Sequence, residues 1–294
     1  MFDLRYHVAS LTAVFVALVI GILVGVGLSG KGFVNDAERD NLTSQISALQ
    51  QEVDSAEGSL ESTTRTKEAL RRLADETYPT VVPGRLEGKK VAVLFVGPVD
   101  AGTAFSVRRA IVDAGGTVVR TRSIRVPLDT KRVQEILKRQ PTFQQLQGAA
   151  RLGEVGETLG TEFVIGEATP LWDALDETLV LERKGLSTPP ADAVVVVRSA
   201  EPQRGLSKAF LAGVYAGLAR TSTAAVGVDT SGTGQSAIPA FALSGLSTVD
   251  SVDTSAGRLA LALVLGGAAP GNYGVKEPAT DGILPPVTPL PQQG

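Results

Sequence analysis

An apolar stretch near the start of the chain constrains its fold more than any other feature. Residues 8–28 comprise 21 positions without a charged side chain. As a helix with a rise of ~1.5 Å per residue, this stretch would span roughly 32 Å, close to the ~30 Å hydrocarbon core of a bilayer. No apolar run of comparable length follows. We therefore expect one transmembrane helix, from which the rest of the chain extends.

Small residues recur every four positions within this stretch. Such spacing aligns them on one face of a helix, where two membrane helices can approach each other closely. The pattern predicts self-association or docking inside the membrane, although Ala and Gly are also common in membrane helices generally. The face comprises Ala9, Ala13, Ala17, Gly21, Gly25 and Ser29.

The flanks of the apolar stretch favour an uncleaved anchor over a cleaved signal peptide. The stretch exceeds the ~7–15 apolar residues of a signal peptide, and the only small pair near its end is Gly27 and Ser29. Charge does not decide the orientation, because Arg5 precedes the stretch while Lys31 and Arg39 follow it. Short N-terminal heads normally stay in the cytoplasm, so we expect a cytoplasmic N-terminus and an extracytoplasmic body at the cell membrane.

A coiled-coil helix is predicted after the anchor. Apolar residues alternate four and three positions apart, the a/d spacing of a coiled coil, although Thr63 and Lys67 weaken the register toward its end. The helix is expected to end at Tyr78-Pro79, because the residue before a proline avoids helical backbone. The narrow seam requires a second copy, a partner helix or the chain's own globular domain. We expect a parallel homodimer, with a helix folded back on its own domain as the alternative. The seam comprises Leu42, Ile46, Leu49, Val53, Ala56, Leu60 and Leu70.

Strands and helices alternate in the remainder of the chain, which predicts an α/β fold: a Rossmann-like, three-layer domain with a mostly parallel sheet. Continuous apolar runs at 90–97 and 193–198 indicate strands buried on both faces. Further strands are expected at 117–121 and 223–228, and helices at 103–114, 129–139, 143–160, 170–182, 206–219 and 253–265, the last capped by Asp253. The expected organisation is a head and anchor at 1–30, a stalk at 31–78, the α/β domain at 85–276 and a Pro-rich disordered tail at 277–294.

The composition argues against several kinds of site. Cysteine is absent, and His7 and Met1 are the only histidine and methionine. Catalytic triads normally need a histidine base, and zinc or copper sites favour His, Cys and Met ligands. A net charge of −3 offers no basic excess to nucleic acid. We therefore expect a non-enzymatic protein with no catalytic residues, no cofactor and no metal site.

Two loops that follow buried strands are candidates for phosphate binding because ligands of doubly wound sheets bind at the carboxyl ends of strands. Loop 96–102 lacks the G-x-G-x-x-G spacing, and Pro98 removes an amide. Loop 227–234 is rich in Gly, Ser and Thr and could present amides to an anion, although it reads more simply as a flexible surface turn. A ligand at this loop would indicate a membrane-tethered enzyme, which is a third hypothesis.

Carboxylates offer no clearer site. Asp-Thr-Ser occurs at Asp229 and Asp253, but both copies lack the glycine of the aspartic-protease motif. Glu154, Glu157 and Glu162 could in principle form a carboxylate site, but their spacing favours a solvated helix face.

Motifs near both ends of the chain resemble one known family. Arg5-Tyr6-His7-x-x-Ser10-Leu11 leads into the apolar stretch, and Ser247-Thr-Val-Asp-x-Val-Asp253-Thr-x-Ala-Gly257 is followed by Tyr273-Gly274-x-Lys276. Together they resemble the actinobacterial MctB-like "copper transporter" family, and the resemblance covers the whole chain.

The resemblance implies a role in copper homeostasis for a channel-like envelope protein. Family members also imply an alternative, a scaffold or activator of septal cell-wall hydrolysis. In that role the external coiled coil would engage a peptidoglycan hydrolase or its regulator, and a cytoplasmic-side protein would share the membrane helix. The missing soft ligands disfavour direct copper ligation by this chain.

Overall fold

The chain divides into two units, Met1–Lys67 and Glu68–Gly294, each of which is described by itself. The computed structural model describes the backbone of residues 4–29, 36–186, 188–232, 234–277 and 279–290; side chains within 4–9, 27–29 and 36–38 are excluded from this description. The boundary expected between the anchor (1–30) and the stalk (31–78) therefore lies outside the described residues.

Helix α1 (Leu4–Ser29) contains the whole apolar stretch. Within the part of the chain that the structure describes, no helix has both the length and the apolar character needed to cross a membrane. The transmembrane prediction is therefore not confirmed.

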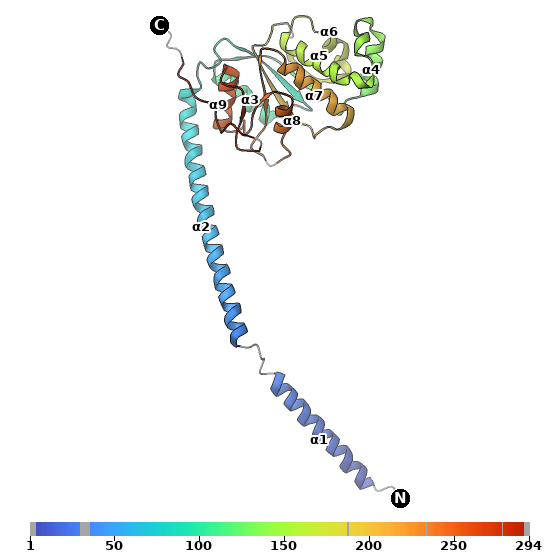
Figure 1. Cartoon of the computed structure of the whole chain (residues 1–294), viewed down its shortest axis with the longest axis vertical. Coiled ribbons are helices and arrows are strands. Elements are labelled where there is room, and N and C mark those ends of the chain that lie inside the picture. Colours follow the sequence, from blue (N-terminus) through green and yellow to red (C-terminus); the bar gives the residue numbers. More distant parts are fainter. Residues whose placement is uncertain (1–3, 30–35, 187, 233, 278, 291–294) are drawn as a thin grey trace. The chain divides into compact units, whose positions relative to one another are not determined.

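Helix α2 (Asp36–Val81) is a single element of 46 residues (Figure 1). The prediction that it ends at Tyr78-Pro79 is wrong, because the helix continues through Pro79 to Val81. Tyr78 is 5% exposed and Val82 is fully buried, and the Val82 amide donates to the Tyr78 carbonyl at 3.1 Å. Pro79 has no amide hydrogen to donate within the helix. The burial of Tyr78 and Val82 offsets the free-energy cost of that missing hydrogen bond.

The second unit contains a seven-stranded sheet in the order β3-β2-β1-β4-β5-β6-β7. Strand β3 pairs antiparallel to β2, and all other neighbouring pairs are parallel. This topology confirms the mostly parallel α/β sheet. The strands are β1 (Lys90–Val96), β2 (Thr117–Ile124), β3 (Val180–Gly185), β4 (Ala193–Arg198), β5 (Ala224–Val228), β6 (Ser247–Val249) and β7 (Asn272–Tyr273).

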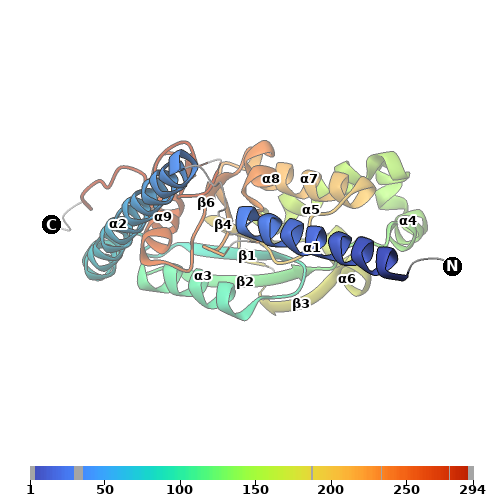
Figure 2. The same cartoon turned by 90° about the horizontal axis from the view of Figure 1, so that it is seen from below.

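Helices cover both faces of this sheet (Figures 1 and 2). Alternate residues of β1 divide between two apolar clusters: Leu94 faces one cluster, and Phe95 faces the other. The first cluster includes side chains of α4 to α8, and the second includes those of α3, α9 and the end of α2. The helices are α3 (Ala101–Asp113), α4 (Thr130–Arg139), α5 (Leu152–Ile165), α6 (Pro170–Leu179), α7 (Gly205–Ala219), α8 (Ile238–Leu243) and α9 (Ser255–Gly266).

Helices α5 and α7 pack backbone to backbone through glycines. A Cβ added to Gly156 would lie 2.1 Å from the Phe210 carbonyl oxygen, and one added to Gly217 would lie 2.1 Å from the Glu157 carbonyl oxygen. Any larger side chain at these positions would force the two helices apart.

Local signals explain the ends of several elements. Asp129 accepts a hydrogen bond from the Arg132 amide at 3.0 Å and caps α4. Past the end of α3, Gly115 has φ +87°, and the Gly116 amide donates to the Ile111 carbonyl, so glycines end this helix.

Two expected helices differ from the structure in their bounds. The helix expected at 143–160 begins as two 3-10 turns, Pro141–Leu146 and Ala149–Arg151, before α5 starts at Leu152. The helix expected at 170–182 ends at Leu179, because the chain turns into the edge strand β3 and pairs with β2.

The Pro-rich tail lies outside helices and strands where it is described. Its proline content predicts a disordered segment, but residues 279–290 contact the domain. The Arg85 guanidinium donates to the Thr288 carbonyl at 2.6 Å, and Pro285 is buried. The final positions, 291–294, lie outside the described residues.

Candidate functional site

The crevice between the carboxyl ends of β1 and β4 is where doubly wound sheets usually bind ligands. Here the two loops touch. Gly97 has φ +98°, and an added Cβ would lie 2.7 Å from the Ala200 Cβ. The Gly97 carbonyl accepts from Ser123 Oγ at 2.6 Å, and the Pro98 carbonyl accepts from Ser199 Oγ. The loops after β1 and β4 are therefore in direct contact at the position where a dinucleotide would bind.

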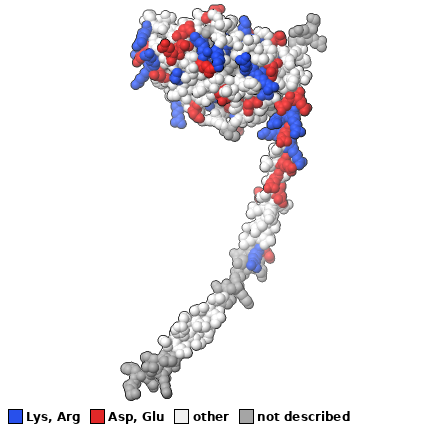
Figure 3. All heavy atoms as spheres, turned by 180° about the vertical axis from the view of Figure 1, so that it is seen from behind, with Lys and Arg blue, Asp and Glu red and all other residues white. Residues whose placement is uncertain are grey.

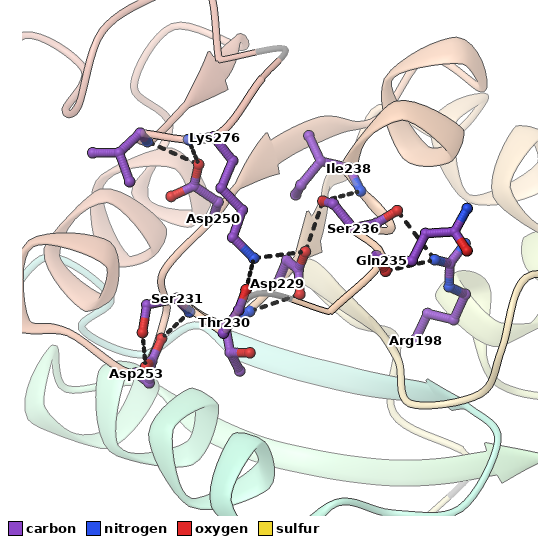
Figure 4. Close-up of polar contacts among 12 residues, drawn as sticks. Arg198, Asp229, Thr230, Ser231, Gln235, Ser236, Ile238, Asp250, Asp253 and Lys276 are labelled. Atoms are coloured by element: carbon purple, nitrogen blue, oxygen red, sulfur yellow. Dashed lines mark hydrogen bonds and ion pairs between the residues drawn. The ribbon is translucent and has the colours of Figure 1, made fainter. Parts of the chain in front are cut away.

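A polar cluster occupies the carboxyl ends of β5 and β6 instead (Figure 4). Asp229 lies at its centre: Oδ2 accepts from Ser236 Oγ at 2.7 Å and pairs with Lys276 Nζ at 3.4 Å. Lys276 Nζ also donates to the Gly232 carbonyl at 2.7 Å. One ammonium group thus connects the loop after β5 to the segment after β7.

Asp250 ties the same segment to the end of β6. Its side chain is 1% exposed, and Oδ2 accepts from the amides of Val275 and Lys276 at 2.8 and 2.6 Å. Gly274, at φ +145°, leaves room for the carboxylate, because an added Cβ would lie 2.1 Å from the Asp250 Cγ. The motif residues Asp250, Gly274 and Lys276, far apart in sequence, form one contact here.

Asp253 does not cap α9, so that prediction is wrong. Thr254 is the N-cap residue, and its Oγ1 accepts from the Gly257 amide at 3.1 Å. The Asp253 carboxylate turns instead to Ser231 and accepts from its amide at 2.7 Å and from its hydroxyl at 2.5 Å. Asp253 precedes the N-cap residue, so its carboxylate is free to hold the loop after β5.

These contacts leave the loop at 227–234 poorly suited to an anion. The amide of Thr230 donates to Asp229 at 2.8 Å, and the amide of Ser231 donates to Asp253. Anion sites of this type depend on free amides and a positive potential. Among the described residues of this loop, carboxylates already accept from two of the amides.

Glu154, Glu157 and Glu162 line an open groove of about 430 Å³ beside α5. Each carboxylate has a partner. Glu154 pairs with Arg151 at 3.0 Å, and Glu157 pairs with Arg220. Glu162 accepts from the Leu171 amide at 3.1 Å at the start of α6, and burial raises the pKa of its carboxyl. Glu162 therefore acts as a helix cap, and within the described residues no three His, Cys, Asp or Glu side chains form a metal cluster.

Two arginines of β2 are buried against aromatic rings, which the sequence pattern did not indicate. Arg120 and Arg122 are 2% and 1% exposed. The Arg122 guanidinium lies 4.6 Å from the Trp172 ring centroid, and the Arg120 guanidinium lies 5.8 Å from the Phe163 centroid. Burial, followed by the nearby charges of other arginines, lowers the pKa of Arg122 to about 10.

The end of α2 is fixed to the α/β domain by polar contacts. Ser255 Oγ, in the first turn of α9, donates to Asp75 at 2.6 Å. The Arg258 guanidinium lies 5.2 Å from the centroid of the Tyr78 ring. Burial and then the charge of Asp113 raise the pKa of the Tyr78 hydroxyl to about 12. The last turns of α2 are therefore held against α9, and the turn before α9 contains Asp253 of the polar cluster.

Where the structure describes them, the positions predicted to mediate association are exposed. On α1, a Cβ added at Gly21 or Gly25 would meet nothing within 4 Å. Ala13 and Ala17 are exposed, while the side chains of Ala9 and Ser29 lie outside the described set. The exposed fraction of the large seam residues ranges from 52% at Leu42 to 67% at Leu60. These observations leave both predicted interfaces as predictions.

Comparison with known proteins identifies the family. No individually curated protein matches the chain. The family model of the copper transport outer membrane protein MctB matches residues 1–284, nearly the full length of the 294-residue chain. The protein therefore belongs to the MctB family of copper-transport proteins of the cell envelope, as its terminal motifs predict.

Proposed function

We propose that the protein is a single-pass, non-enzymatic envelope protein that serves copper homeostasis as an assembly of chains. The family match over residues 1–284 is the observation that carries this proposal. The uncharged stretch at 8–28 supports α1 as the membrane anchor, with the N-terminus in the cytoplasm and the stalk and α/β domain outside.

Two surfaces support a parallel homodimer. The small-residue face of α1 would let two membrane helices meet at Gly21 and Gly25. In α2, Ile46 and Val53 occupy a positions, while Leu42 and Leu49 occupy d positions. β-Branched residues at a positions, combined with Leu at d positions, favour a parallel coiled coil of two helices. Both surfaces therefore support the same orientation of the two chains.

The composition supports an indirect or shared role in handling copper. Copper prefers thiolate, thioether and imidazole ligands, and this sequence contains no Cys, with one His and one Met. We place the copper-related function in an assembly, through oxygen ligands or through partners.

A second candidate function is a scaffold or activator of septal cell-wall hydrolysis. The exposed apolar seam of α2 favours it, because a long helix with an uncovered stripe is suited to docking another helix. In this case the stalk would bind a hydrolase or its regulator.

One pair of variants separates these candidates. Replacing Ile46, Leu49 and Val53 by Ser would remove the centre of the seam while retaining the helix. The matched control replaces Ala48 and Gln51, on the outer face of the same turns, by Ser. Copper tolerance and cell separation are scored in the same cells.

Copper sensitivity with normal cell separation would support the copper role. Chained cells with normal copper tolerance would overturn it in favour of the scaffold. If the seam variant behaves like the control in both assays, neither function depends on the seam of α2.

A further inference from the structure

We propose that the apolar face of α2 between residues 42 and 60 binds, in preference to a second copy, a partner helix with apolar heptads flanked by Lys or Arg. This inference rests on the proposed coiled-coil use of α2 and specifies the chemistry of the partner.

The apolar face is open and of useful length. Leu49 is 60% exposed and Val53 is 54% exposed. Between Ile46 and Asp54 the surface is hollowed into a groove of about 250 Å³. From Leu42 to Leu60 a helix extends ~27 Å, which is enough for knobs-into-holes packing over about two and a half heptads.

Charge is strongly segregated along the same part of the helix. Between Arg39 and Arg65 the sequence contains five acidic residues and no basic residue. Figure 3 shows this acidic stretch of the stalk and the basic side chains that follow it. Glu61 pairs with Arg65, but no ion pair forms at the other four within the described part of the chain. The acidic residues are Asp40, Glu52, Asp54, Glu57 and Glu61.

The heptad register places two of these carboxylates beside the seam. With Ile46 and Val53 at a, Glu52 is at g and Glu57 is at e. In a parallel pair, each g residue faces the e residue five positions later on the other helix. A homodimer would therefore oppose Glu52 to Glu57 on both sides of the seam, and like charges at this distance repel.

A partner helix with basic e and g residues would place a positive charge opposite both Glu52 and Glu57. It would bury the same apolar face and replace two repulsive pairs by two attractive pairs. Each repulsive pair lost or attractive pair gained contributes ~0.3–0.5 kcal/mol to the binding free energy. Over the four pairs, a basic helix should bind about tenfold more tightly than an acidic helix of the same design. Charge complementarity, rather than apolar area, therefore selects the partner.

Disulfide capture in the full-length chain tests the proposal. The chain has no cysteine, so Leu49→Cys introduces a single thiol at a d position. The probes are two synthetic peptides of about four heptads with Ile at a, Leu at d and one Cys at d. One peptide carries Lys at every e and g position, and the other carries Glu. The assay measures peptide–chain and chain–chain disulfides in detergent at low salt.

We expect the Lys peptide to form about tenfold more adduct than the Glu peptide and to reduce the chain–chain disulfide. Adding Glu52→Lys and Glu57→Lys should reverse the preference between peptides. Gln51→Cys, at the outer f position, should form little adduct with either peptide.

Equal capture of both peptides, or a preference that survives the charge reversal, would overturn the inference. Chain–chain disulfides without peptide capture would also overturn it and would assign the face to a second copy. Lys-peptide capture without chain–chain disulfides would support it and overturn the homodimer along the seam. If neither disulfide forms at Leu49→Cys, the proposed coiled coil itself is wrong.

Discussion

The glycine contact between α5 and α7 predicts a large effect from a single added methyl group. In Gly160→Ala, the new Cβ would lie 2.3 Å from the Val214 carbonyl oxygen and 2.9 Å from the Leu218 amide nitrogen. Ordinary contact begins at 3.4 Å, so the oxygen is 1.1 Å too close. Both obstacles are backbone atoms of α7, which cannot rotate away as a side chain can.

The free energy of unfolding should therefore fall. Overpacking costs about 1–3 kcal/mol, and a backbone obstacle favours the upper end. Replacing a helical glycine by alanine returns about 1 kcal/mol of helix propensity. The net loss is about 2 kcal/mol, which corresponds to a decrease in Tm of ~4–8 °C for a domain of this size.

Trp172 provides the assay, because it is the only tryptophan and is 1% exposed. Its Nε1 donates to the Leu159 carbonyl of α5 at 2.8 Å, so its fluorescence reports on the affected layer. Gly153→Ala is the matched control: the nearest atom to its Cβ is the Ala209 carbonyl oxygen at 3.6 Å, an ordinary contact. An unchanged midpoint for Gly160→Ala, or an equal loss for Gly153→Ala, would refute the packing argument.

Three further predictions concern the motif contact and the base of the stalk. Gly274→Ala should lower the unfolding midpoint in urea more than Asp250→Asn, because its Cβ meets the buried carboxylate at 2.1 Å and its φ of +145° is unfavourable for alanine; an equal effect of both variants would contradict this account. The pKa of Tyr78, raised to about 12 from ~10 in unfolded chains, means that its stabilising contribution is present below about pH 10 and is lost as the pH rises through 12. Tyr78→Phe should therefore flatten alkaline unfolding between these pH values, and an unchanged alkaline limb would count against it. Ser255→Ala should leave Asp75 without its hydrogen bond and speed limited proteolysis at the end of α2; cleavage at the wild-type rate would show that the contact does not secure the stalk.

Much of the α/β domain could be predicted from local sequence patterns. The continuous apolar runs of β1 and β4 and the Asp129 cap depend on neighbouring residues, so their signals are visible in sequence. Strand β3 escaped prediction because Glu182, Arg183 and Lys184 give it no apolar pattern, and only its pairing with β2 makes it a strand. Strands β6 and β7 contain three and two residues, too few to show a period.

The polar cluster was harder to predict because its contacts connect distant segments. Asp250 binds amides 25 and 26 residues away, and Lys276 reaches Asp229 across 47 positions. Asp253 matches the pattern of a helix cap equally well, and only the position of Ser231 shows its actual partner. The motif residues indicated the family. Only the structure shows that they form hydrogen bonds that connect separate loops.

The central claim, that α2 works through its apolar seam, is tested most directly by a cysteine scan of residues 45–60 in the membrane-embedded full-length chain. Because the chain has no cysteine, each variant carries one thiol. With no partner helix added, two copies should meet along the seam, and the account predicts chain–chain disulfides in a repeat of ~3.5 residues, with maxima at Ile46, Leu49, Val53 and Ala56 and minima at Gln51 and Gly58. A flat profile, or maxima at the outer positions, would contradict the account.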